Sequence, residues 1–353
     1  MASTKRQLAY KLALSAAGIV ALSLGLFHFL SGWHCDQTSR PSIESRGALG
    51  KLLFYDPSLS VDGTVSCATC HIPTQMFADN KRTPMGVYGR VGTRNAPSLA
   101  VISTAQDVSF FWDGRRSALD QAVIDPLTNP IEMGLPDQAE LIRRIKQNPN
   151  YVSTFAKAFP ESPQLTTKQV GQALADYVRS ISPPPSYYER YAMQGDEAAL
   201  SPSAKLGLTI FKGKAQCAEC HVLQGAPAML TDHLYHRTGI GLDVVSEHLP
   251  ELTQAIIQRS LKGAAIGDRV AAHLDEAQLG RFNVTLNPAD IGLFRTPSLR
   301  SVALTAPYMH DGSILTLEEA IDREVYYRSL QAGHPLNLSV EERKNLKAFL
   351  EAL

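Results

Sequence analysis

The sequence lacks an excess of charge of either sign. Among its 353 residues, Lys and Arg together number 34, and so do Asp and Glu. A nucleic-acid-binding protein would carry a surplus of basic residues, so we expect no nucleic-acid partner. Glycine and proline, at 24 and 21 residues, are too few for a fibrous or low-complexity chain. With 44% apolar and 19% charged residues, the composition is that of a globular protein and excludes wholesale disorder.

Charged residues are missing altogether from residues 12–30, which are mostly apolar. Lys5, Arg6 and Lys11 precede this run, and the first acidic residue is Asp36. A run of this length can cross a bilayer as a helix, and basic residues before it keep the N-terminus in the cytoplasm. The alternative is a cleaved signal peptide, whose apolar core is normally shorter and ends at a small-x-small cleavage site. We therefore expect residues 1–35 to anchor a periplasmic protein to the inner membrane by a single N-terminal helix.

Cysteine is scarce, but four of the five cysteines form two close pairs. Each pair is followed by a histidine, in the motifs Cys67-Ala-Thr-Cys70-His71 and Cys217-Ala-Glu-Cys220-His221. C-x-x-C-H is the attachment pattern of a c-type haem, in which two thiols bond the porphyrin and the histidine ligates the iron. A zinc site would leave the two histidines unexplained, and a thioredoxin-like dithiol would need a βαβ context that is missing. We therefore expect two covalent haems, with His71 and His221 as iron ligands.

The two halves of the chain resemble each other beyond these motifs. The segment RNAPSL at 94–99 matches FRTPSL at 294–299, and Trp112-Asp-Gly matches His310-Asp-Gly. The distance from the haem motif to the matching proline is about fifty residues longer in the second half. One cytochrome-like unit has therefore been duplicated, and the second copy carries an insertion.

Alternating strand patterns are scarce, whereas helix signals recur. Thr166 with Gln169, and Ser339 with Glu342, form capping boxes before apolar residues at helical spacing. Ser201 and Pro202 mark another helix start, after the proline-rich linker that begins at Ser182. We expect a mostly α fold of two tandem cytochrome c-like haem domains, residues 36–195 and 196–353, after the N-terminal transmembrane helix.

In order and spacing, these motifs and three others resemble the bacterial di-haem cytochrome c peroxidase and MauG family. The others are FFWDGR at 110–115, NPIEMG at 129–134 and TAPYMHDG at 305–312, and the resemblance covers about residues 45–353. It implies an oxidoreductase in which the N-terminal haem reacts with peroxide. The C-terminal haem would relay electrons or store oxidising equivalents.

The resemblance also implies roles for single residues. Trp112 lies where the family places a tryptophan between the haems, and Glu132 matches its distal acid, which moves a proton during peroxide cleavage. Asn95, Thr305 and Pro307 match a calcium site between the domains, with hard oxygen ligands.

Two departures from the family pattern concern the haem ligands. Classical members often hold a histidine about sixteen residues after the first motif, but residues 84–90 contain none, so the first iron would be open at rest, as in MauG. Classical members ligate the second iron with a methionine fourteen residues after the His310 position, where this chain has Glu324. MauG-like members carry a tyrosine there. We expect Tyr326 to be the ligand of the second iron, brought into register by a two-residue insertion. Tyr327, Glu324 or an open site are the alternatives.

The expected function is reduction of hydrogen peroxide to water with electrons from a small cytochrome c or copper protein. The alternative is a MauG-like enzyme that uses peroxide to oxidise a side chain of a partner protein, which the missing histidine and methionine favour. A plain electron-transfer cytochrome is the third possibility, against which an open iron and Glu132 argue.

Overall fold

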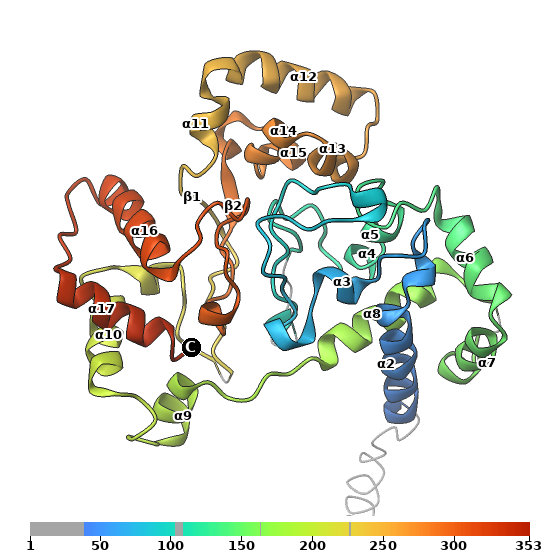
Figure 1. Ribbon diagram of the computed structural model, residues 1–353, viewed down its shortest axis with the longest axis horizontal. Coiled ribbons are helices and arrows are strands. Elements are labelled where there is room, and N and C mark those ends of the chain that lie inside the picture. The colour runs from blue at the N-terminus through green and yellow to red at the C-terminus, as the bar shows by residue number, and fades with distance from the viewer. Residues whose placement is uncertain (1–38, 103–108, 163, 226) are drawn as a thin grey trace, which may run out of the picture. The chain divides into compact units, whose positions relative to one another are not determined.

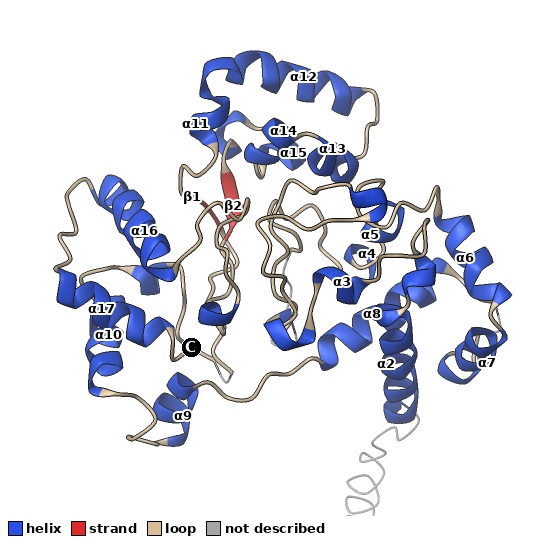
Figure 2. Ribbon diagram, viewed as in Figure 1, coloured by secondary structure: helices blue, strands red, loops and turns tan. Residues whose placement is uncertain are grey.

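The computed structural model describes residues 39–102, 109–162, 164–225 and 227–353 (Figure 1). The expected membrane anchor lies outside these residues, and within them no helix has the length and apolar character needed to cross a bilayer. Residues 45–353 form one unit. It is mostly helical, as predicted (Figure 2). The boundary between residues 195 and 196 stays a prediction, and we use it below to name an N-terminal and a C-terminal half.

Helices provide nearly all of the regular structure. The N-terminal half contains α2 (Ser39–Tyr55), α3 (Cys67–Cys70), α4 (Leu119–Ala122), α5 (Asp125–Thr128), α6 (Gln138–Gln147), α7 (Pro149–Ala158), α8 (Thr167–Ser180) and α9 (Tyr187–Gln194). The C-terminal half contains α10 (Pro202–Lys212), α11 (Leu242–Val245), α12 (Leu249–Leu261), α13 (Ile266–Ala272), α14 (Leu274–Gln278), α15 (Phe282–Thr285), α16 (Leu317–Ala332) and α17 (Val340–Leu350). Strands β1 (Tyr235–Arg237) and β2 (Leu293–Arg295) pair antiparallel, with Tyr235 opposite Arg295.

The helix starts predicted from the sequence are confirmed. At α8, the Thr166 side chain accepts from the Gln169 backbone N–H, and the Gln169 side chain accepts from that of Thr166. Ser339 and Glu342 form the same reciprocal pair at α17. At α10, the Ser201 hydroxyl accepts from Ala204 N. Each cap satisfies backbone donors that have no partner inside the helix.

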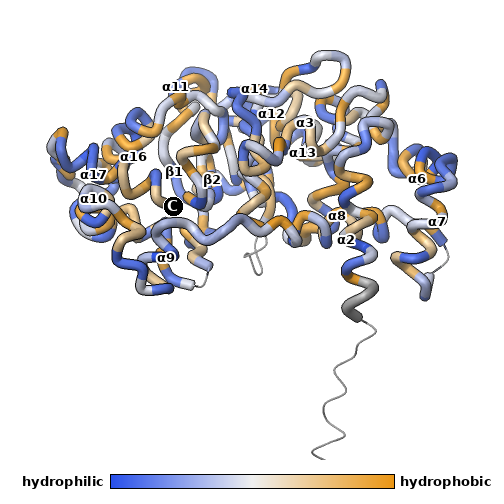
Figure 3. The backbone as a smooth tube through the Cα atoms, turned by 60° about the horizontal axis from the view of Figure 1, so that its bottom comes forward, coloured by the Kyte–Doolittle hydropathy of each residue, from blue (hydrophilic) through white to orange (hydrophobic). Residues whose placement is uncertain are grey.

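Each half is built around a helix crossing that requires glycine. A Cβ atom on Gly50 of α2 would lie 1.9 Å from the carbonyl oxygen of Ala173 in α8. A Cβ on Gly207 of α10 would lie equally close to the oxygen of Asn345 in α17. Hydrophobic residues lie along α2 and α8 where these two helices cross (Figure 3). A hydrophobic core surrounds each crossing, and the first cysteine of each haem motif packs against it, Cys67 in the N-terminal half and Cys217 in the C-terminal half.

The matching segments of the repeat bind each other across the two halves. Asn95 N donates to His310 O at 2.8 Å, and Arg295 N donates to Trp112 O at 2.9 Å. Asn95 and Arg295 are equivalent positions of the repeat, as are Trp112 and His310. The two hydrogen bonds are therefore related by the duplication itself.

The insertion in the C-terminal half forms helices α11 to α15 with a small core of their own. This core is made by Val245, Ile256, Leu279 and Phe282. Inserted residues also contact the N-terminal half, where Thr93 Oγ1 donates to Val270 O at 2.6 Å.

Candidate haem sites

The first attachment motif lies on α3, a single helical turn. Burial, with a smaller contribution from the Glu132 carboxylate, raises the pKa of the Cys67 thiol to about 12. His71 Nδ1 lies 2.9 Å from the carbonyl oxygen of Phe77, to which it donates. Burial lowers the pKa of His71. A neutral imidazole with its proton on Nδ1 leaves Nε2 free to ligate a metal.

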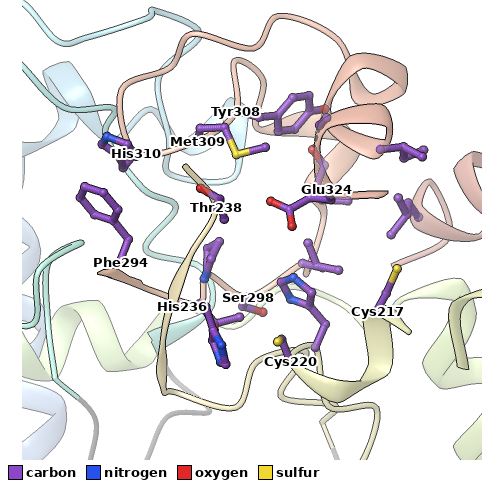
Figure 4. A pocket seen from close by; sticks show the side chains of 18 of the residues that line it. Cys217, Cys220, His236, Thr238, Phe294, Ser298, Tyr308, Met309, His310 and Glu324 are labelled. Atoms are coloured by element: carbon purple, nitrogen blue, oxygen red, sulfur yellow. Dashed lines mark hydrogen bonds between the residues drawn. The ribbon is translucent and has the colours of Figure 1, made fainter. Parts of the chain in front are cut away.

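The second motif repeats this arrangement in the C-terminal half. His221 Nδ1 lies 3.0 Å from Leu230 O, and burial lowers the pKa of His221 to about 4. Cys217, Cys220 and His221 all line one cavity of about 250 Å³ (Figure 4). Two thiols and a neutral imidazole that open on one cavity are the donors that a c-type haem requires, so the residues fit this group.

The same cavity brings together residues predicted from both halves. Asn95, Thr305 and Pro307, the predicted calcium ligands, line it, and so does Trp112. The Trp112 indole donates to Asn95 O at 2.9 Å. The tryptophan and the predicted calcium ligands therefore border the site of the second haem, although they lie far apart in the sequence.

Glu132 lies beside the first attachment motif, in the turn before the buried Met133. It is half-buried, and burial, followed by the charges of Asp79 and Glu132, raises the pKa of Cys70 to about 12. The carbonyl of Glu132 accepts from Val87 N at 2.9 Å. The structure thus brings the predicted distal acid to the N-terminal motif.

The segment in which classical members hold a histidine packs on this turn. A Cβ on Gly86 would lie 1.9 Å from Ile131 O, so only glycine permits the approach. Val87 is fully buried in the core, whereas the Tyr88 side chain is 63% exposed.

Tyr326, the expected ligand of the second iron, does not reach the cavity. Its side chain is 56% exposed, whereas Glu324 and Tyr327 line the cavity. At about 100° per residue, positions 324 and 327 share one face of α16, and position 326 points some 200° away from 324. The expectation that Tyr326 ligates the second iron is therefore wrong, and Tyr327, Glu324 or an open site remain as the alternatives.

Sequence reasoning missed several polar partners around the cavity. His236 Nε2 lies 2.7 Å from the Asp232 carboxylate, and Arg328 is paired with Glu219. Glu219 occupies a position that the second C-x-x-C-H motif leaves variable, and the other three residues belong to no motif, so nothing in the sequence signalled these pairs. Met309, within the TAPYMHDG segment, also lines the cavity, and its side chain points into it (Figure 4).

Comparison with known proteins decides the family. The family model for di-haem cytochrome c peroxidases matches residues 44–198. A cytochrome-c peroxidase, IdrP1, from Pseudomonas sp. (strain SCT) is 33% identical over 325 residues, which cover 89% of this chain and 82% of that protein. The chain belongs to the di-haem cytochrome c peroxidase and MauG family. This family comprises oxidoreductases that act on peroxide, and it implies two c-type haems.

Proteins named as cytochrome c peroxidases and proteins named MauG are both similar to this chain. The methylamine utilization protein MauG of Methylorubrum extorquens is 32% identical over 321 residues, 89% of this chain and 80% of that protein. A crystal structure of a MauG-like protein associated with microbial copper homeostasis superposes with a TM-score of 0.69 at 30% identity, and covers 88% of this chain and 89% of that one. Family membership therefore does not separate a peroxidase from a MauG-like enzyme.

Proposed function

We propose that this protein reduces hydrogen peroxide to water, with electrons from a small cytochrome c or copper protein. The observation that carries the proposal is the half-buried Glu132 beside the first pair of haem-attachment thiols. The haem bound there supplies the iron at which the O–O bond is cleaved. Two electrons and two protons convert each peroxide into two waters, so the site must deliver protons as well as electrons.

Of Glu132, His71 and Trp112, only Glu132 suits the proton transfer. Cleavage requires that one proton leave the inner oxygen of peroxide and reach the outer oxygen, which departs as water; a carboxylate can accept and return it. His71 is not available, since its Nδ1 proton is donated to Phe77 O and its Nε2 is the predicted iron ligand. The indole of Trp112 is no base, and its N–H is donated to Asn95 O.

Trp112 is proposed to carry electrons between the two sites. It belongs to the N-terminal half but lines the cavity of the second haem, and Arg295 N holds its carbonyl across the halves. An aromatic ring at this place shortens the path between two irons. A calcium ion at Asn95, Thr305 and Pro307 would hold the same region together. We place the enzyme in the periplasm, anchored by residues 1–35.

The first iron is proposed to be open in the resting enzyme. Val87, about where a blocking histidine would lie, is fully buried in the core, and Tyr88 points into solvent. These placements support direct access of peroxide without prior reduction.

A MauG-like oxidation of a partner protein is the second candidate. Glu324 and Tyr327, both oxygen donors, line the second cavity, and a hard anionic ligand favours the ferric state. A second haem held at low potential is better suited to storing oxidising equivalents than to taking electrons from a small carrier. Steady peroxide consumption with a reduced small cytochrome or copper protein supports the peroxidase, and its absence supports the MauG-like enzyme.

Substitution of Glu132 tests the proposal. Glu132→Gln keeps size and hydrogen bonding but removes the proton acceptor, so peroxide turnover should fall by roughly 100- to 10,000-fold with both haems retained. Turnover is measured by peroxide consumption, and haem content by absorbance of the denatured, reduced protein. Glu161→Gln, at an exposed position, is the control and should match the wild type. Near wild-type turnover in the haem-loaded Glu132→Gln protein would rule out this role.

A further inference from the structure

Glu324 occupies an unusual place for a carboxylate. It lies near the middle of α16, where its neighbours Ala320, Ile321 and Val325 are buried in the C-terminal core. Its carboxylate points into the cavity, which Cys217 and Cys220 border (Figure 4). An acidic side chain on the inward face of a helix is costly unless a positive charge lies beside it.

The cations near Glu324 are already paired with other acids. Arg328 pairs with Glu219, and His236 with Asp232 at 2.7 Å. Within the described part of the chain, no hydrogen bond reaches the Glu324 carboxylate. The chain therefore supplies a carboxylate to this cavity without supplying its counter-ion.

We infer that the Glu324 carboxylate is the second protein ligand to the iron of the haem attached at Cys217 and Cys220, with His221 as the first. Ferric iron in a porphyrin carries a net positive charge, and a carboxylate oxygen is a hard donor suited to it. The inference rests on the second haem of the proposed function, but it does not depend on peroxide turnover.

Two other possible donors that line the cavity, Tyr327 and Met309, fit less well. The ring of Tyr327 lies against Gly239, where a Cβ atom would lie 2.4 Å from it, so the ring is committed to this packing. Met309 lies in a turn, with a positive φ of 72°. Glu324 lies in a regular helix that is capped by Thr316 and Gly333, so its backbone is held more firmly. Ligation by the neutral Met309 would also leave the Glu324 charge without a partner.

Spectroscopy of the resting, haem-loaded protein in the absence of peroxide tests this assignment. A weak-field carboxylate ligand should leave the second ferric haem high-spin in electron paramagnetic resonance. In Glu324→Gln, the signal of that haem should change, while the signal of the other haem stays. Glu324→Met should turn it low-spin and raise its reduction potential, because a thioether ligand favours the reduced state.

Two control variants separate Glu324 from its neighbours. Tyr326→Phe, on the exposed side of the same helix, and Met309→Leu should both leave the signals of the two haems unchanged. A change in Met309→Leu with none in Glu324→Gln would overturn the inference, and so would thioether coordination in the wild-type spectrum. The wild-type spectrum decides even where a variant fails to mature. A failure of the proposed peroxidase would appear instead in turnover and would leave these spectra as described.

Discussion

At the scale of single residues, Asp113 shows how the Trp112 segment of the repeat is held in place. Its side chain is completely buried and pairs with Arg94 at 2.6 Å and Arg115 at 3.1 Å. Its backbone oxygen accepts from Arg281 of the C-terminal half at 3.0 Å. Burial alone would raise the pKa of Asp113, but the two guanidinium groups hold it below its usual value. Asp113 therefore fixes the backbone beside Trp112.

Removal of the Asp113 charge should destabilise the protein strongly. Asp113→Asn leaves Arg94 and Arg115 buried without a counter-ion, which costs about 3–5 kcal/mol in free energy of unfolding. Because the folded pKa of Asp113 lies below the unfolded value of ~3.9, the difference is present above that pH and shrinks as the pH falls through the folded pKa. Denaturant unfolding of the haem-loaded wild type and of Asp113→Asn, at several pH values, measures this difference in free energy of unfolding.

An exposed ion pair provides the control for this prediction. Glu341 and Lys344 lie 3.9 Å apart with both side chains at least 70% exposed. Glu341→Gln should change the free energy of unfolding by less than about 1 kcal/mol. Equal effects of the two substitutions would contradict the account of Asp113.

The sequence predicted which residues lie near the two haem sites better than it predicted where their side chains point. Glu132 lies near the first attachment motif and Trp112 lines the second cavity, while their roles stay predictions. Tyr326 does not line that cavity, because a shift of two positions on a helix turns a side chain to the opposite face. The pairing of Arg328 with Glu219, which are 109 residues apart, depends on a chain path that no local pattern encodes.

At the scale of elements, the two helix crossings depend on glycine for space rather than for backbone freedom. Gly50 and Gly207 both lie inside helices, where alanine is normally preferred by up to about 1 kcal/mol. In both cases the oxygen of the facing helix would lie 1.9 Å from a Cβ atom. The crossing distance is therefore set at these two positions.

Alanine substitutions in α2 test this reading. Gly50→Ala should lower the free energy of unfolding by about 1–3 kcal/mol, because α2 and α8 must move apart. Gly47→Ala, in the same helix with nothing within 4 Å of the added Cβ, should be neutral or stabilise by up to about 1 kcal/mol. Thermal unfolding of both haem-loaded variants measures the difference, and destabilisation of equal size would show that helix packing is not the cause.

The starts of helices α8 and α10 could be predicted because a helix cap is formed by residues that are close in the sequence. The hydroxyl of Ser201 and the carboxamide of Gln169 bond atoms three residues away, so the sequence alone reveals them. The insertion was predictable in length but not in structure. Its helices α11 to α15 are short, and they are held by a core and by contacts with Thr93 that lie far apart in the chain.

At the scale of the whole molecule, duplication explains the link between the two halves. Each copy donates a backbone N–H to the other, from Asn95 to His310 and from Arg295 to Trp112. The sequence revealed the repeat but not these two hydrogen bonds, because a sequence repeat shows which segments are similar and not which segments are in contact. The second cavity consequently contains residues of both halves, among them Asn95 and Trp112.

The reaction of the resting protein with peroxide tests the central claim most directly. Rapid mixing of the fully oxidised di-haem protein with equimolar hydrogen peroxide should change the haem absorbance at once, without prior reduction, if the first iron is open as proposed from the buried Val87 and the exposed Tyr88. The Glu132→Gln protein should respond at least about 100-fold more slowly. Absence of any change until one haem has been reduced would contradict the open first site and, with it, this account of the enzyme.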